Sequence, residues 1–137
     1  CALNRRLNHD RFKFTFAAVG AKSGELITIE ANSDTHIPLL HKKNVTYEYE
    51  CMTLALDDFA EANKIMPTHI KIDVDGAEHD VLIGASKILQ SPSIKDVFIE
   101  IDHHNLGVID VLKSHGFKIK WQLEKAQNTD VLFSKEI

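Results

Sequence analysis

Two acidic side chains that could do chemistry stand near the middle of the chain, where an apolar stretch ends. Apolar and polar residues alternate over residues 70–75, the period-two pattern of a strand, and Asp73 and Asp75 are among the polar ones. Gly76 then permits a turn, and apolar residues recur at helical spacing from Glu78 onward. Ligands of open α/β sheets bind beyond the carboxyl ends of the strands. Asp73 is therefore a candidate functional residue, whereas capping of the helix accounts for Asp75.

A second polar group follows another apolar run. Residues 97–101 read as a strand buried on both faces, and Asp102, His103, His104 and Asn105 come directly after it. Imidazole accepts protons near neutral pH without a large pKa shift, so His103 and His104 are candidate general bases. The alternative for each is a solvated loop side chain. The remaining histidines are scattered along the chain without the spacing of a zinc site.

The composition bounds the class of protein. A chain of 137 residues forms one domain with a core of useful size. Its net charge of −4 argues against nucleic acid or an anionic membrane surface as a partner. No apolar run approaches the length of a membrane span, and no secretory leader is visible. Cys1 and Cys51 do not make a disulfide framework, so we expect a cytoplasmic protein.

The elements that must position these residues follow from the apolar periodicity. Helices are expected to begin at Asp57, Glu78 and Leu106, and residues 31–44 read as an irregular connection. A helix separates the strands at 70–74 and 97–101, which predicts that they are parallel neighbours. Only a tight turn joins the last two strands, which must be antiparallel. The expected strands cover residues 12–19, 26–29, 45–51, 70–74, 97–101, 117–123 and 131–133.

Several motifs together resemble the FkbM-type methyltransferases. The central one is Ile70-Lys71-Ile72-Asp73-Val74-Asp75-Gly76-Ala77-Glu78, which combines strand, turn and helix signals. The likeness covers nearly the whole chain. Its other parts are residues 17–20, 23–25, 53–59, 81–82, 84–85, 98–101 and 116–117, and Phe133.

The resemblance implies a Rossmann-like class I methyltransferase fold, with a mostly parallel sheet that ends in an antiparallel hairpin. It implies S-adenosylmethionine as cofactor and a hydroxyl of a sugar or natural product as methyl acceptor. By position in this fold, Ala18 and Val19 would lie beside the adenine of the cofactor. Asp73 would lie near the methyl group, in contact with cofactor and acceptor, and His103 and His104 would follow the fifth strand as catalytic candidates.

Methyl transfer to a hydroxyl needs an acceptor oxygen aligned behind the methyl group and a base for its proton. Alignment supplies much of the acceleration. A positioned base contributes roughly 10²–10⁴-fold. Asp73, His103 and His104 are the side chains that the resemblance makes available for this role.

The resemblance also implies that part of the domain lies upstream of this chain. The family's glycine-rich cofactor loop and its ribose-binding acidic residue should lie before Cys1. Gly20 and Gly24 do not replace that loop, because they are too far apart and do not open a helix. We therefore expect residues 1–137 to be one N-terminally truncated methyltransferase domain. By itself it should bind the cofactor weakly or not at all, whereas the complete protein should bind it.

Two alternative functions use the same residues. Residues 73–76 with Asp102, His103 and His104 are similar to the signature pair of the DHH phosphoesterases, which bind two manganese ions. Lys71 stands where that family has a further aspartate. A non-catalytic methyltransferase-like module is the other alternative. The motif also differs from the haloacid dehalogenase phosphatases, which need threonine at Ala77. The sequence leaves open the methyl acceptor, a metal requirement and the oligomeric state.

Overall fold

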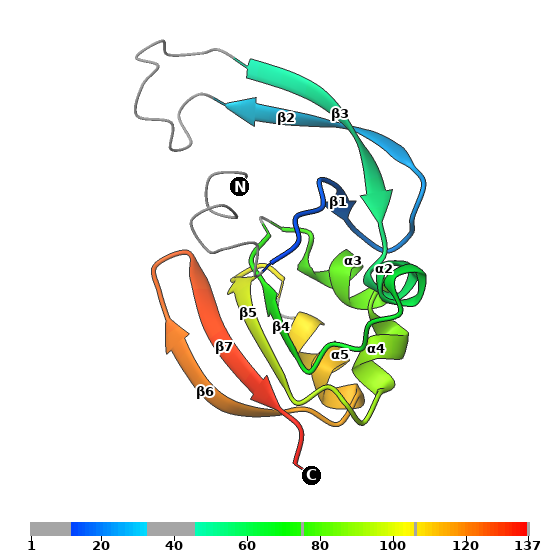
Figure 1. Cartoon of the computed structure of the whole chain (residues 1–137). Coiled ribbons are helices and arrows are strands. Elements are labelled where there is room, and N and C mark those ends of the chain that lie inside the picture. The colour runs from blue at the N-terminus through cyan, green and yellow to red at the C-terminus, as the bar shows by residue number, and fades with distance from the viewer. Residues whose placement is uncertain (1–11, 33–45, 75, 106, 137) are drawn as a thin grey trace.

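The computed structural model describes residues 12–32, 46–74, 76–105 and 107–136, and shows a mixed α/β domain with two sheets (Figure 1). The strands are β1 (Ala18–Val19), β2 (Leu26–Asn32), β3 (Thr46–Leu54), β4 (His69–Ile72), β5 (Asp96–Asp102), β6 (Lys118–Glu124) and β7 (Asn128–Ser134). The helices are α2 (Leu56–Asn63), α3 (Glu78–Ile83), α4 (Ser86–Gln90) and α5 (Gly107–Ser114).

The larger sheet has four strands in the order β4-β5-β7-β6. β4 and β5 are parallel, which confirms the prediction from the helical connection between them. β7 lies between β5 and β6 and is antiparallel to both, so the predicted terminal hairpin is also confirmed. The sheet therefore brings the carboxyl ends of β4 and β5 together at one edge.

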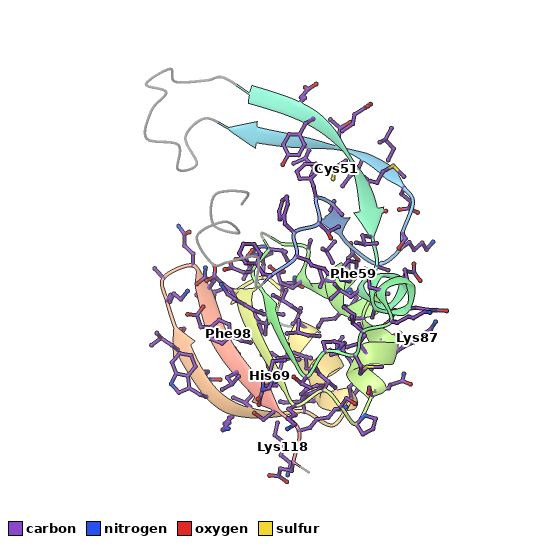
Figure 2. All side chains as sticks on the ribbon, in the orientation of Figure 1. Cys51, Phe59, His69, Lys87, Phe98 and Lys118 are labelled. Atoms are coloured by element: carbon purple, nitrogen blue, oxygen red, sulfur yellow. The ribbon has the colours of Figure 1, made fainter. Side chains whose placement is uncertain are left out.

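The core lies between this sheet and the helices. Val97, Ile99 and Ile101 on β5 are buried, and they alternate with the partly exposed Phe98 and Glu100. The prediction of a strand buried on both faces is thus wrong for the described residues, since the helices α3 and α5 cover one face only. Figure 2 shows the side chains crowded between the four-stranded sheet and the helices, with Cys51 apart from them on β3.

The apolar stripe after Glu78 forms two short helices rather than one. α3 ends before Gly84, and α4 begins at Ser86. At Gly84 the backbones approach so closely that a Cβ would lie 2.1 Å from the carbonyl oxygen of Gly20. The Gly84 carbonyl also accepts a 2.8 Å hydrogen bond from the backbone N–H of Asp57. A contact distant in sequence therefore interrupts the helical pattern.

The smaller sheet is built around β3, which pairs parallel with β1 and antiparallel with β2. The β2–β3 hairpin arches away from the body of the domain (Figure 1). Of the strand expected at residues 12–19, only residues 18–19 form a strand, because no described strand pairs with residues 12–17. Most of the expected connection at 31–44, the start of the strand at Val45 and the helix start at Leu106 lie outside the described residues.

The prediction of a mostly parallel sheet is not confirmed. In the described residues only the β1–β3 and β4–β5 pairs are parallel, and the other three pairs are antiparallel. The antiparallel pairs come from two hairpins. The β2–β3 hairpin adds β2 to the smaller sheet, and the β6–β7 hairpin adds β7 to the larger sheet, next to β5.

Candidate active site

The polar residues predicted to carry chemistry lie at one edge of the four-stranded sheet. Asp73 follows Ile72, the last residue of β4, and Ile72 pairs with Ile99 on β5. His103 and His104 follow the end of that same neighbouring strand. The parallel pairing therefore brings the loops that carry these residues to the same edge.

The Asp73 carboxylate is paired with a lysine of β4, the strand that directly precedes it. Its Oδ2 atom lies 2.7 Å from Nζ of Lys71, and the two side chains are 54% and 64% exposed. Hydrogen bonding and charge attraction from Asp73 raise the pKa of Lys71 above its usual 10.5, with weaker help from Glu100 and Asp130. An acidic and a basic residue two positions apart on a strand lie on one face, so the sequence already contained the signal for this pair.

The two candidate histidines are exposed to solvent. Nε2 of His104 lies 3.8 Å from the Asp102 carboxylate, with the imidazole side chain 80% exposed. The backbone N–H of His103 donates a 3.4 Å hydrogen bond to the carbonyl of Gln127. The structure therefore places both in a solvated turn after β5, where a base would be open to an acceptor molecule.

A charged cluster holds the β6–β7 turn against β5. Nζ of Lys125 lies 2.6 Å from Glu100 and 2.7 Å from Asp130. These two carboxylates, Asp130 first, raise the pKa of Lys125. Asn128 donates a further 2.6 Å hydrogen bond to Glu100. The two carboxylates of the cluster are bound by Lys125 and Asn128, so the cluster reads as structural, although the buried Oδ1 atom of Asn128 has no hydrogen-bond partner among the described residues.

The sequence did not predict that one carboxylate, that of Glu78, is buried. Glu78, at the start of α3, is 1% exposed. Its Oε1 atom accepts a 3.0 Å hydrogen bond from the backbone N–H of Gly76, and its Oε2 atom accepts one from Nδ2 of Asn105. The sequence suggests only a favourable charge in the first turn of a helix. A better signal was available, since Glu78 stands three and four positions before the buried Val81 and Leu82.

A cavity of about 350 Å³ lies next to the loop that Glu78 holds. Ala18 and Val19, the predicted cofactor-binding residues of β1, both line it. Asp73, His103 and His104 are not among its lining residues. The cavity therefore unites only part of the predicted site. Its complete lining is Ala18, Val19, Gly20, Ala21, Lys22, Glu25, Ile27, Thr53, Ala77 and Asp80.

The described parts of the chain hold neither a cluster of metal ligands nor a helix that could cross a membrane. No group of three or more histidine, cysteine, aspartate or glutamate side chains there could hold a metal ion. No helix there is long and apolar enough to cross a membrane.

The family model for the methyltransferase FkbM domain matches residues 3–119. The chain belongs to this family. The match covers most of the sequence, including the motif around Asp73 and the stretch that forms the cavity. The FkbM domain supports methyl transfer as the general activity, which the phosphoesterase alternative does not share. Comparison with curated proteins gave no match, and neither did comparison with solved structures.

Methyltransferases of this kind imply S-adenosylmethionine as cofactor, and the lining of the cavity offers both apolar and acidic side chains to an adenosyl group. Ala18, Val19 and Ile27 supply an apolar wall of the kind that accepts a flat adenine ring. Glu25 and Asp80 add carboxylates that can accept hydrogen bonds from hydroxyl or amino groups. The lining thus combines apolar side chains, which can pack against a ring, with carboxylates, which can accept hydrogen bonds.

Proposed function

We propose that this FkbM domain transfers a methyl group from S-adenosylmethionine to a hydroxyl of a small molecule, a sugar or a natural product. The observation that carries the proposal is the cavity at Ala18 and Val19, since residues singled out for the adenine line a space of about 350 Å³. The family match supports methyl transfer in general.

The cofactor would supply an activated methyl group on a positively charged sulfur. The chain's own residues would then have three tasks. Ala18 and Val19 exclude water from the apolar face of the adenine. The Asp73 carboxylate attracts positive charge and orients the acceptor hydroxyl at the end of β4. A base takes the proton that the hydroxyl oxygen loses as its bond to the methyl carbon forms.

The candidates for the base that accepts this proton are Asp73, His103 and His104. Asp73 is already hydrogen-bonded to Lys71, which competes for its oxygen atoms. His103 and His104 are exposed and adjacent to the same sheet edge. Neighbouring loop side chains point in different directions, so His103→Ala and His104→Ala should differ in their effect on methyl transfer.

The decisive variant is Asp73→Asn in the complete protein. Loss of both charge and proton acceptance should lower methyl transfer at least about tenfold. The assay follows a labelled methyl group from S-adenosylmethionine to a panel of sugars and hydroxylated natural products. Asp110→Asn, an exposed change on α5, is the matched control and should leave the rate unchanged. Equal rates for Asp73→Asn and wild type would remove Asp73 from the mechanism.

A second assay sets methyl transfer against phosphoester hydrolysis. Wild-type protein is incubated with manganese and a generic phosphodiester, and we expect no hydrolysis. Manganese-dependent cleavage that disappears in Asp73→Asn would instead refute the methyltransferase proposal. The same variant therefore separates the two functions that share this residue.

A further inference from the structure

The loops after β4 and β5 are tied together by one buried side chain. Glu78 lies in α3, directly after the β4–α3 loop, and Asn105 lies 27 residues away in the β5–α5 loop. Their side chains form a hydrogen bond, and the other carboxylate oxygen of Glu78 accepts from the N–H of Gly76 at 3.0 Å. One carboxylate thus contacts both loops that carry the proposed catalytic residues.

The chemistry of this contact is specific. An ionised carboxylate only accepts hydrogen bonds, so Asn105 must present its NH₂ group and Gly76 its backbone N–H. With 1% exposure, Glu78 has exchanged water for these two donors. A buried carboxylate without them would carry a large desolvation cost. Gly76 has φ of +87°, a conformation that L side chains rarely adopt, and its amide is held in that turn by Glu78 and by the Val74 carbonyl at 3.0 Å.

The position of Glu78 gives this contact a consequence for the cavity. Ala77 stands between Gly76 and Glu78 and lines the cavity together with Asp80. On the other side, the Asn105 backbone N–H closes the turn that contains His103 and His104 by donating 2.8 Å to the Asp102 carbonyl. Movement of the Glu78–Asn105 contact would therefore displace both a cavity wall and the histidine turn.

We propose that Glu78 is a positioning residue that locks the β4–α3 loop to the β5–α5 loop. Its hydrogen bonds fix the position of Ala77, which lines the cavity, relative to the turn that contains His103 and His104. Simple capping of α3 would need the contact to Gly76 alone, whereas the contact to Asn105 reaches a separate element. The catalytic consequence rests on the proposed methyl transfer, but the lock itself does not.

An exchange of donor and acceptor tests the lock. Asn105→Asp sets two carboxylates against each other and should break the contact. Adding Glu78→Gln restores a donor and an acceptor, with their places reversed. Glu78→Gln alone should be mild, because the Asn105 amide can turn over and accept. Glu78→Leu removes both acceptors and cannot be rescued at Asn105.

The primary readout is hydrogen exchange of the Gly76 backbone amide, measured by NMR at mildly alkaline pH. Asn105→Asp should speed this exchange at least about tenfold, although Gly76 and Asn105 are far apart in sequence. The double variant should return it to within about twofold of wild type. Asn63→Asp makes the same chemical change on the exposed face of α2 and should have no effect at Gly76.

Two results would overturn the lock: a Gly76 exchange rate unchanged by Asn105→Asp, or a double variant no slower in exchange than Asn105→Asp. The secondary readout is cofactor binding and methyl transfer by the complete protein, which should fall in Asn105→Asp and recover in the double variant. If wild type neither binds S-adenosylmethionine nor transfers methyl groups, the proposed function fails, and the Gly76 exchange still decides the lock.

Discussion

Asp73 and Lys71 meet through a 2.7 Å ion pair at the end of β4, on the side of the strand turned away from the buried Ile72. Both side chains are more than half exposed, so the pair contributes little to folding stability. Its importance is local, because it fixes the direction of the one carboxylate that directly follows β4. An acceptor or cofactor that approaches Asp73 must therefore share it with Lys71.

The first prediction concerns the titration of Lys71. Asp73 raises its pKa above 10.5, so the small stability from the pair is fully present below pH 10.5 and disappears as pH rises through the raised value. Asp73→Asn should bring the Lys71 pKa back toward 10.5. NMR titration of the Lys71 side chain measures this, with Asp110→Asn as a control that leaves it raised. An identical Lys71 titration in Asp73→Asn and wild type would contradict the pairing.

The second prediction concerns the break between α3 and α4. Gly84→Ala would place a Cβ 2.1 Å from the Gly20 carbonyl oxygen, so two backbones must separate. We expect a loss of at least about 2 kcal/mol in the free energy of unfolding, as for overpacked cores. Gly107→Ala is the matched control, since a Cβ there meets nothing within 4 Å. Urea denaturation of both variants checks this, and equal stabilities would contradict the close approach at Gly84.

The third prediction concerns Asp57, whose carboxylate caps a helix other than its own. It accepts 2.9 Å hydrogen bonds from the backbone N–H groups of Lys87 and Ile88 at the start of α4. Asp57→Ala should lower the free energy of unfolding by about 1–2 kcal/mol, the usual effect of losing such a cap. Asp110→Ala, in the first turn of α5, is the comparison and should cost less. Thermal unfolding gives the difference, and an Asp57→Ala loss no larger than that of Asp110→Ala would rule out the cross-helix cap.

The fourth prediction concerns the cavity. Ala18→Phe should fill part of the space of about 350 Å³ and weaken S-adenosylmethionine binding to the complete protein. We expect the affinity to decrease at least about tenfold, because the phenyl ring would occupy space that the adenosyl group needs. Thr28→Phe, on an exposed part of the hairpin, should leave affinity unchanged. Calorimetric titration compares them, and undiminished binding by Ala18→Phe would move the adenosyl site elsewhere.

The sequence by itself determined the features that depend on neighbours along the chain. The alternation at residues 70–75 and the apolar run at residues 97–101 specified two strands, and the helical stripe between them required a parallel crossover. The tight connection expected at residues 126–129 required the antiparallel β6–β7 pair, although β7 already begins at Asn128. The motif around Asp73 also indicated the family, which the match to the FkbM domain confirms. Each of these signals is local, because backbone periodicity and turn length depend on residues that are consecutive in the chain.

Only the tertiary structure decided the features that depend on contacts across the chain. Helical periodicity passes through Gly84 without a sign of the Gly20 backbone that interrupts it. The first turn of a helix explains the charge of Glu78, but not its burial or its hydrogen bond to Asn105. The apolar run of β5 is covered on one face because α3 and α5 lie on the same side of the sheet. Burial and pairing of this kind depend on which distant segments pack together, and only the folded structure shows those contacts.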